Sequence, residues 1–376
     1  MATILMINTV PKDFLHHMAP YIKSLRSSGN RVVLVSSGNA ECLKDLVDVN
    51  NDYFNAGITR KPNLISDFSS LLKIYKVIIS IKPDVIHTIS PKAGLLGVLA
   101  GYCAFAPIRI HTFTGQVWVN KKGLVRVILK SFDQIICLLC THLLADSVSQ
   151  KKFLIEHGVV KDGKIGILGN GSVCGVDQER FSRNYGVRKK VREEYSIGES
   201  DLVFLFMGRL NRDKGVYDLL QAFQKINRSV KVWLLLVGVC EDEQLLKLLL
   251  RLDERIIYQK YSPTPENYYW MSDVLCLPSY REGFGNVIIE AAAASLPCMA
   301  SRIYGITDAV EDGSSGLLHE AGNVEEIKRC FEFWMENTKN IADMGNYARQ
   351  RAFENFSTRN LVQEFLEMYR KLGVNI

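Results

Sequence analysis

The chain has 376 residues, of which 47% are hydrophobic and 23% charged, a composition that excludes a disordered protein and allows two domains of ordinary size. The charge is uneven: residues 1–190 carry 25 basic and 13 acidic side chains, whereas residues 191–376 carry 21 basic and 27 acidic ones. We expect the basic half to meet anionic lipid or an anionic substrate. Nucleic acid is disfavoured, since no nucleic-acid-binding module accompanies the lysines.

The nine cysteines stand mostly inside apolar runs, a pattern typical of buried thiols in a reducing compartment. Cys137 and Cys140 form a CxxC pair without the further ligands that zinc needs, so we expect core packing and no metal site there. Residues 1–7 lack the basic region of a signal peptide, and no apolar run nearby approaches the roughly 20 residues of a membrane-spanning helix. The sequence therefore predicts a cytoplasmic protein.

Short β-branched runs recur along the first half of the chain, and helical patterns fill the intervals. In the first interval Phe14, Met18, Ile22 and Leu25 recur at helical spacing, and Gly29 ends that helix. This alternation predicts a parallel, doubly wound sheet. The expected strands are 4–8, 31–36, 85–90, 109–113, 143–147 and 164–169.

A polar stretch, 181–201, interrupts this pattern before a second α/β series begins. We therefore expect an α/β fold of two Rossmann-like parallel-sheet lobes facing a cleft. The predicted domains are 1–180, 181–360 and a last helix at 361–376 that can cross back to the first lobe. Neither lobe has the GxGxxG motif of a dinucleotide site, which disfavours a nicotinamide oxidoreductase. The expected strands of the second lobe are 202–208, 232–238, 255–259, 274–278, 298–301 and 316–318.

Two cations follow the first strand of the second lobe. That strand ends at Gly208, and Arg209 and Lys214 come before a helix that begins near Val216. A guanidinium, an ammonium and a helix N-terminus at one point are the groups that hold a diphosphate. Solvated loop charges would give the same pattern, so this segment alone does not decide between the two interpretations.

The segment 279–290 favours the ligand-binding interpretation. It places Glu282 on a glycine-rich loop and Glu290 on the helix that follows, both at the carboxyl edge of a sheet, where open α/β folds bind ligands. Glycines on either side of Phe284 let a backbone approach a ligand closely. Glu290 can accept both hydroxyl groups of a ribose. Cations for a diphosphate and a carboxylate for a ribose together predict a sugar-nucleotide site.

These motifs resemble those of the retaining glycosyltransferases of family 4, which have the two-domain GT-B fold. The resemblance covers nearly the whole chain, and its N-terminal segments are most similar to a bacterial subgroup that builds O-antigen or capsule repeat units. The segments that carry it are 208–210, 214–215, 279–290, 305–308 and 312–317 in the second lobe and 87–97, 112–115 and 170–177 in the first.

The resemblance implies that Arg209 and Lys214 neutralise the donor diphosphate as it leaves, that Glu282 contacts the donor sugar and that Glu290 contacts the ribose. Retention then favours attack on the same face of the sugar, with the leaving phosphate oxygen accepting the acceptor's proton. The cations replace a metal, so no metal or other cofactor is expected. Further donor contacts are implied for Gly208, Phe284, Gly285 and Asn286.

The chain also departs from the family pattern. Residues 8–13 lack the glycine pair that many members have in the first turn, and Thr114 precedes Gly115 where many members have a histidine. Thr114 could bond the sugar through its hydroxyl. His111 could point into the cleft or be satisfied inside its strand. Cys174 stands where asparagine is commoner in the subgroup.

The basic lobe has candidates for acceptor and membrane contact. Lys92 is the candidate for the acceptor. Basic side chains around Trp118 alternate with apolar ones, as expected at an anionic membrane surface, although a core-facing helix with solvated lysines gives the same pattern. The membrane-docking candidates are Trp118, Lys121, Lys122, Arg126 and Lys130.

We therefore predict transfer of a UDP-linked hexose, such as GalNAc or GlcNAc, to an undecaprenyl-diphosphate-linked saccharide. The enzyme would act at the inner face of the cytoplasmic membrane in the assembly of bacterial surface polysaccharide. The alternatives are a sugar-nucleotide epimerase or hydrolase on the same fold and a non-enzymatic binding protein. Turnover without an acceptor would favour the epimerase or hydrolase, and binding without turnover would favour the binding protein.

Overall fold

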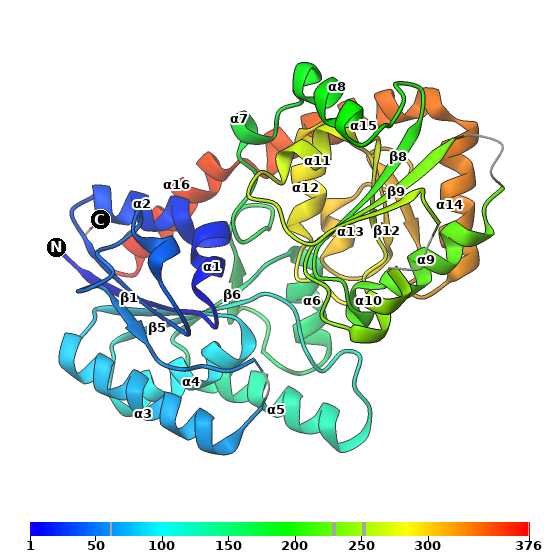
Figure 1. Cartoon of the computed structure of the whole chain (residues 1–376). Helices are drawn as coiled ribbons and strands as arrows, with labels where there is room; N and C mark the ends of the chain where they lie inside the picture. The colour runs from blue at the N-terminus through cyan, green and yellow to red at the C-terminus, as the bar shows by residue number, and fades with distance from the viewer. Residues whose placement is uncertain (61, 228–230, 250–252, 375) are drawn as a thin grey trace. The chain divides into compact units, whose positions relative to one another are not determined.

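A computed structural model describes residues 1–60, 62–227, 231–249, 253–374 and 376. These residues form two compact units, Met1–Cys174 with Thr358–Ile376, and Gly175–Ser357 (Figure 1). The sequence predicted the first domain boundary after residue 180. In the structure it lies between Cys174 and Gly175, because Val176 and Phe181 belong to the core of the second unit. No helix in the described ranges has both the length and the apolar character needed to cross a membrane.

The described part of the first unit contains a seven-stranded parallel sheet in the order β3-β2-β1-β4-β5-β6-β7. Each strand expected from the sequence is present. β3 was not predicted, because it spans only three residues and follows a polar turn. The strands are β1 (Thr3–Ile7), β2 (Arg31–Ser36), β3 (Tyr53–Asn55), β4 (Val85–Ile89), β5 (Ile108–Phe113), β6 (His142–Ala145) and β7 (Ile165–Ile167).

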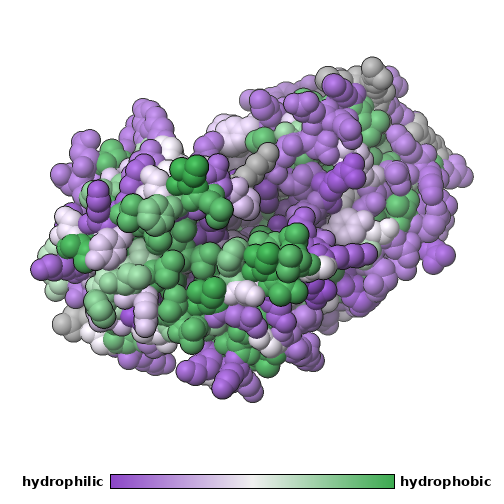
Figure 2. Space-filling view, turned by 90° about the horizontal axis from the view of Figure 1, so that it is seen from below, coloured by the Kyte–Doolittle hydropathy of each residue, from purple (hydrophilic) through white to green (hydrophobic). Residues whose placement is uncertain are grey.

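Helices cover both faces of this sheet, which explains why its strands read as continuous apolar runs. Ile4 and Met6 of β1 pack toward α2 (Ala19–Ser27) and the C-terminal helix α16 (Thr358–Lys371), whereas Leu5 and Ile7 pack toward α3 (Leu64–Ile81) and α4 (Pro91–Cys103). Beside α4 lies α5 (Gly123–Leu139), and α6 (Val148–Glu156) follows β6. Figure 2 views the molecule from the side of α3, α4 and α5, where hydrophobic residues gather at the surface.

Two short segments precede α2. α1 (Pro11–Asp13) leads into a turn of π-helix, η1 (Phe14–Met18), so the periodic apolar residues here do not form one regular α-helix. Gly29 lies in the left-handed region just after α2, as its position predicted. The C-terminal helix α16 joins this unit through a buried contact in which the Tyr369 hydroxyl lies 2.9 Å from His87 Nδ1.

The described part of the second unit contains a six-stranded parallel sheet in the order β10-β9-β8-β11-β12-β13. The chain runs outward from β8 to β10 and then returns to β11 on the other side of β8. The carboxyl ends of β8 and β11 therefore form the topological switch point, where open α/β sheets bind ligands. The strands are β8 (Leu202–Met207), β9 (Val232–Val237), β10 (Ile256–Gln259), β11 (Val274–Leu277), β12 (Cys298–Ser301) and β13 (Gly316–His319).

Helices flank this sheet on both faces, so the second α/β series predicted from the sequence is present. The polar stretch at its start folds partly into α8. The helices are α7 (Gln178–Phe181), α8 (Tyr185–Glu194), α9 (Val216–Lys225), α10 (Glu243–Leu249), α11 (Glu266–Met271), α12 (Asn286–Ala293), α13 (Ile306–Ala309), α14 (Val324–Glu336) and α15 (Thr338–Asn355).

Candidate active site

The loop after β8 is held against the end of β11. Gly215 lies in the left-handed region, and a Cβ atom there would overlap the carbonyl oxygen of Pro278. The Asn211 side chain accepts a hydrogen bond of 3.1 Å from the Lys214 amide and so caps the 3-10 turn of residues Arg212–Lys214. Only glycine allows this approach of two backbones. The loop thereby brings Lys214 to the segment that carries Glu282.

Lys214 and Glu282 form an ion pair at the switch point. The Lys214 ammonium donates to Oε1 of Glu282, and the Ser279 hydroxyl donates to the same oxygen at 2.8 Å. Both charged side chains are largely buried. The cation and the first glutamate of the sequence motif are therefore in direct contact. Ser279, which orients the carboxylate, was quoted in the motif but was not assigned a role.

Arg209 has a different partner. Its Nη1 lies 2.9 Å from Oε2 of Glu241, which also accepts from Asn211 Nδ2 at 2.8 Å. Almost half of the arginine side chain is exposed, so its ion pair contributes little to stability. The guanidinium can leave Glu241 at small cost and turn to a phosphate. Sequence reasoning missed Glu241, since a lone acidic residue after β9 carries no motif.

A second set of contacts ties the two loops together. The Tyr280 amide donates to the Asp213 carbonyl at 2.9 Å, and the Arg281 guanidinium lies 3.3 Å from the Asp213 carboxylate. The Tyr280 hydroxyl donates to Asp218 of α9 at 2.8 Å. Asp213 belongs to the loop after β8 and Asp218 to α9, which follows that loop, whereas Tyr280 and Arg281 belong to the loop after β11. These contacts fix the loop of Lys214 relative to the loop of Glu282.

The glycine-rich turn leads directly into α12. Gly285 has a positive φ, and a Cβ atom on Gly305 would overlap the carbonyl oxygen of Gly283. The Phe284 side chain is buried against Phe356, with ring centroids 5.0 Å apart, so only its backbone can face a ligand. Asn286 begins α12 at the carboxyl edge of the sheet. The turn is thus fixed by packing from behind.

Glu290 lies on the second turn of α12, half-buried, and its Oε2 accepts a hydrogen bond of 2.6 Å from the Tyr269 hydroxyl. Burial raises the pKa of Glu290 to about 7, and the hydrogen bond from Tyr269 and the charge of Arg180 only partly offset this. Glu282 bonds Lys214 and Ser279 instead. The two glutamates therefore have separate partners and do not share a proton as a hydrolytic pair would.

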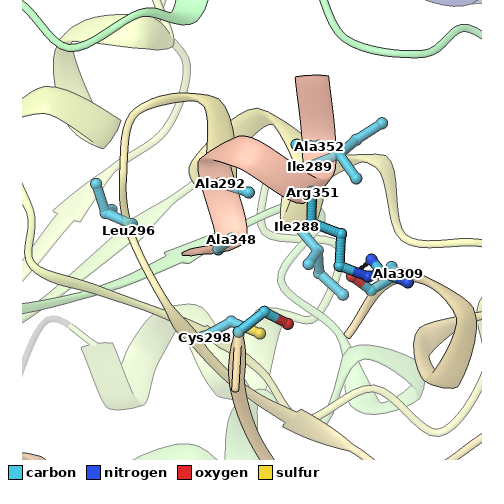
Figure 3. A pocket seen from close by; sticks show the side chains of 10 residues that line it. Ile288, Ile289, Ala292, Leu296, Cys298, Ala309, Ala348, Arg351 and Ala352 are labelled. Atoms are coloured by element: carbon cyan, nitrogen blue, oxygen red, sulfur yellow. Dashed lines mark hydrogen bonds between the residues drawn. The ribbon is translucent and has the colours of Figure 1, made fainter. Parts of the chain in front are cut away.

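The other face of α12 is apolar. Ile288, Ile289 and Ala292 pack toward Ala348 and Ala352 of α15 and line a cavity of about 10 Å³ (Figure 3). That volume holds at most about one water molecule and is far too small for a sugar. The cavity is a gap in the packing. It shows that α12 is anchored through this face while Glu290 projects from another.

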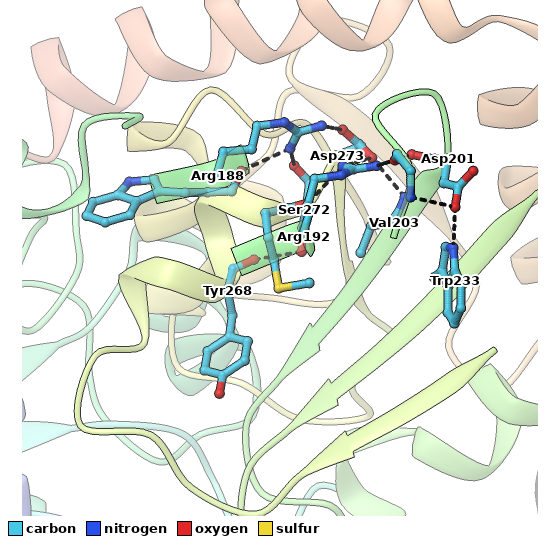
Figure 4. A network of polar contacts seen from close by, with 11 residues as sticks. Arg188, Arg192, Asp201, Val203, Trp233, Tyr268, Ser272 and Asp273 are labelled. Atoms are coloured by element: carbon cyan, nitrogen blue, oxygen red, sulfur yellow. Dashed lines mark hydrogen bonds and ion pairs between the residues drawn. The ribbon is translucent and has the colours of Figure 1, made fainter. Parts of the chain in front are cut away.

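A polar network of α8, β8 and β11 lies at the opposite edge of the sheet. Arg188 of α8 pairs with Asp273 at 2.7 Å, Arg192 is fully buried beside the same carboxylate, and Asp273 accepts the Val203 amide at 2.8 Å (Figure 4). Asp201 nearby accepts from the Trp233 indole at 2.8 Å. Because these groups surround the amino ends of the strands, they fix α8 to the sheet and take no part in the site.

In the first unit the switch point lies between β1 and β4. The Thr9 and Ser90 hydroxyls, which follow these strands, lie 2.9 Å apart. Ser90 has a φ of 71°, which is strained for a residue other than glycine and is typical of functional sites. Thr114 follows β5 at the same edge and is half-buried. Sequence reasoning did not single out Thr9, and backbone strain at Ser90 has no sequence signal.

His111 is part of the core. It is fully buried, its Nδ1 lies 2.9 Å from the Thr88 hydroxyl, and a Cβ atom on Gly94 of α4 would overlap its ring. Burial lowers its pKa to about 3, so the ring stays neutral. The structure places His111 inside the core with Nδ1 bonded to Thr88, while its Nε2 has no hydrogen-bond partner among the described residues.

Lys92 makes an internal ion pair. Its ammonium lies 2.5 Å from Oδ1 of Asp67 on α3 and 2.9 Å from the Thr59 hydroxyl, and the side chain is mostly buried. An acceptor would have to displace Asp67 to reach it. The structure thus gives Lys92 a role in joining α3 to the start of α4, and its contact with an acceptor stays a prediction.

Trp118 was expected at the membrane surface, and this expectation is wrong. Its side chain is 0% exposed, its indole N–H donates to Asp133 of α5 at 2.7 Å, and it stacks on Phe153. Arg126 and Lys130 lie over its ring at 5.6 and 6.0 Å. Lys121 and Lys122 are exposed just before α5. A tryptophan among lysines gives the same sequence pattern whether it is buried beneath them or exposed beside them.

Comparisons with known proteins match both halves of the chain to glycosyltransferases. Residues 16–173 match the model of Glycosyltransferase Family 4, and residues 187–351 match that of Glycosyl transferases group 1. The capsular polysaccharide biosynthesis glycosyltransferase CapM of Staphylococcus aureus is 30% identical over 359 residues, which cover 94% of this chain and 93% of CapM.

A second relative has a more detailed name. The UDP-Gal:alpha-D-GlcNAc-diphosphoundecaprenol alpha-1,3-galactosyltransferase of Escherichia coli is 26% identical over 334 residues, which cover 86% of this chain and 84% of that protein. Among solved structures, Anabaena HepE in complex with UDP-glucose superposes with a TM-score of 0.80 at 18% identity and covers 99% of this chain and 100% of its own. That structure shares the fold.

Proposed function

The chain belongs to glycosyltransferase family 4, and on that premise we propose that it is a retaining transferase that moves a hexose from a UDP-sugar to a lipid-linked saccharide. Its two-lobe α/β fold is GT-B, and its relatives support a role in capsule or O-antigen synthesis. The observation that carries the proposal is the contact of Lys214 with Glu282 at the switch point of the second unit.

The ion pairs of the site are suited to exchange partners with a donor. The diphosphate would take Lys214 from Glu282 and Arg209 from Glu241, each of which now holds a cation in place. Each cation keeps an anionic partner through the exchange, whereas the largely buried Glu282 loses its counter-ion and needs hydrogen bonds in its place. Glu282, released from Lys214 but still held by Ser279, would accept hydrogen bonds from the sugar hydroxyls.

The remaining contacts would fix the rest of the donor. Glu290 would accept the ribose hydroxyls, with Tyr269 orienting its carboxylate. The backbone of Gly208, Phe284, Gly285 and Asn286 would approach the phosphates or the sugar, since their side chains are absent, buried or at a helix start. A positioned backbone at a helix N-terminus suits negative charge.

The chemical step would be a same-face displacement. The bond from the sugar's anomeric carbon to the diphosphate oxygen breaks, the acceptor oxygen forms the new bond on the same face, and the acceptor's proton passes to the leaving oxygen. Arg209 and Lys214 would stabilise the charge that develops on the diphosphate, which is commonly the largest catalytic term. These cations take the role that a metal ion has in other transferases, so we propose that no metal is needed.

The acceptor follows from the relatives and from charge. The Escherichia coli relative is named for transfer to a diphosphoundecaprenol-linked sugar, and the first half of this chain is strongly basic. We propose an undecaprenyl-diphosphate-linked saccharide as acceptor, presented at the inner face of the cytoplasmic membrane. The donor would carry galactose, glucose or one of their N-acetyl forms.

The proposal is tested by incubating the purified protein with each of these UDP-hexoses and a synthetic GlcNAc-diphosphate-lipid acceptor. We expect a disaccharide product from one donor, with an α-linkage by proton NMR and unchanged yield in EDTA. A β-linked product would overturn retention, and loss of yield in EDTA would overturn metal independence. Donor that is isomerised or hydrolysed without acceptor, and with no transfer product, would favour the epimerase or hydrolase instead.

A further inference from the structure

Helix α5 has its apolar side turned outward. Leu124 is 72% exposed and Leu138 81%, and Val127 and Ile128 between them are also exposed. The charged residues of the same helix, Arg126, Lys130 and Asp133, lie on the inner side around Trp118. A helix on the surface of a water-soluble protein normally has the reverse arrangement. Packing against the unit therefore does not explain the apolar residues of the outer side.

Helix α3 has two apolar sides. Ile74 and Ile78 are buried against the sheet. Five other apolar residues recur every three or four positions along a second, open side and are all exposed, with Leu64 at 90% and Phe68 at 62%. This spacing keeps them on one stripe of the helix. The exposed residues of the stripe are Leu64, Phe68, Leu72, Tyr75 and Ile79.

The two stripes belong to one face of the unit. α4 packs against both α3 and α5, and at its end Tyr102 and Phe105 are also exposed. Figure 2 shows hydrophobic residues gathered over this side of the molecule. We call the exposed apolar residues of α3, α5 and the end of α4 the apolar face. Contiguous patches of this kind on a monomer usually mark a binding surface.

The charges around the apolar face have one sign. Lys73, Lys76, Lys121 and Lys122 are exposed on α3 and just before α5. Within 64–81 and 121–139, all of which the structure describes, the acidic residues are Asp67, paired with Lys92, and Asp133, buried beneath Trp118. A second copy of this chain would bring lysines toward lysines. Anionic headgroups would meet the lysines while the lipid chains cover the apolar residues.

From this combination we propose that the apolar face of α3, α4 and α5 docks on an anionic bilayer, with Leu64, Phe68, Leu124 and Ile128 entering the headgroup boundary. This docking rests on the proposed function, because a lipid-linked acceptor would require the enzyme to work at a membrane. It differs from the sequence expectation in its residues, since Trp118 is buried and α3 contributes to the surface.

The test is co-sedimentation with vesicles, which needs neither donor nor acceptor. We expect the protein to bind vesicles of phosphatidylglycerol and phosphatidylethanolamine and to bind pure phosphatidylcholine much more weakly. The double variants Leu64→Glu with Phe68→Glu and Leu124→Glu with Ile128→Glu should each lower binding at least tenfold. Val148→Glu, at another exposed apolar position in the same unit, is the matched control and should bind like the wild type.

Two further measurements keep the outcomes separate. Lys121→Ser with Lys122→Ser, a change confined to exposed side chains, should lower binding to the anionic vesicles about tenfold and does not threaten folding. Transfer to a short, water-soluble acceptor should stay at the wild-type rate in every variant of the apolar face. If the wild type does not transfer sugar to the soluble acceptor, that result counts against the proposed function, while the vesicle measurements still test the docking proposal.

Three results would overturn the docking proposal. The first is a wild-type protein that does not bind anionic vesicles. The second is unchanged vesicle binding in the folded variants. The third is a wild-type dimer at micromolar concentration, measured by analytical ultracentrifugation, that these variants dissociate, because the occupant of the apolar face would then be a second copy of the chain.

Discussion

The switch points of the two units occupy the same place in two similar sheets but contain different chemistry. In the second unit this place contains Lys214 and Glu282 in an ion pair, with Arg209 close by in the same loop. In the first unit it contains the hydroxyls of Thr9 and Ser90. Charged, exchangeable pairs suit a diphosphate, whereas neutral hydroxyls suit a sugar. The fold offers the position, and the side chains at the strand ends decide what is bound.

Part of the positive charge of the first unit lies away from its switch point. Lys73, Lys76, Lys121 and Lys122 are exposed beside the apolar face of α3, α4 and α5, while Lys92, at the start of α4, is paired with Asp67. A basic composition therefore does not by itself indicate a basic binding site. In this unit several exposed lysines flank an apolar surface. In the second unit Lys214 and Arg209 form part of the candidate site, although the sequence there is acidic overall.

Removing Lys214, the largely buried cation, tests the difference between the two switch points most directly. We expect Lys214→Ala to lower kcat about 10²- to 10³-fold, because charge on the leaving diphosphate loses a preorganised partner and Glu282 loses its counter-ion. Lys225→Ala, which removes an exposed lysine from the same unit, should stay within about twofold. A Lys214→Ala enzyme with wild-type kcat would exclude this site assignment.

Arg209 should show a somewhat smaller effect, because its guanidinium must first leave Glu241. We expect Arg209→Ala to lower kcat about 10²-fold. The matched change is Glu241→Ala, which removes the competing carboxylate and should lower the donor KM by about two- to fivefold, the range of one exposed ion pair. Steady-state kinetics with varied donor measures both. A raised donor KM in Glu241→Ala would mean that Glu241 positions the arginine instead of competing for it.

Much of this arrangement was predictable. Buried parallel strands read as apolar runs, and parallel order places their carboxyl ends at one edge, so Lys214 and Glu282 could be expected near each other. Their direct contact and the role of Glu241 could not, because side-chain partners depend on the loop geometry that Gly215 and Pro278 set. The orientation of α5 was also hidden, since composition does not tell which side of a helix meets its neighbour.

Gly215 tests how far the second switch point depends on close backbone approach. We expect Gly215→Ala to destabilise the protein by more than about 3 kcal/mol, because its Cβ would overlap the Pro278 carbonyl. Gly313→Ala is the control, with a similar positive φ but open space around the new Cβ, and should cost about 1 kcal/mol. Thermal unfolding separates the two. Equal losses would show that backbone conformation, and not the contact with Pro278, requires glycine at 215.

Glu290 should make donor binding depend on pH. Its pKa is raised to about 7 by burial, and only the ionised carboxylate can accept both ribose hydroxyls. The ionised fraction falls about tenfold between pH 8 and pH 6, so the donor KM should rise by up to about tenfold over that range. Glu290→Gln, which stays neutral, should have a higher KM at pH 8 and little dependence on pH.

The same group should affect stability in the opposite direction. Because the folded pKa lies above the ordinary value of 4.5, protonation favours the folded state, and the contribution of Glu290 to stability falls as pH rises from about 4.5 to about 7. Glu290→Gln should therefore raise Tm relative to the wild type at pH 8 and have little effect at pH 4. A wild-type donor KM that is flat from pH 6 to 8, together with a lower Tm for Glu290→Gln at pH 8, would show that this carboxylate is ionised throughout. The two glutamates of the motif would then differ in position but not in charge state.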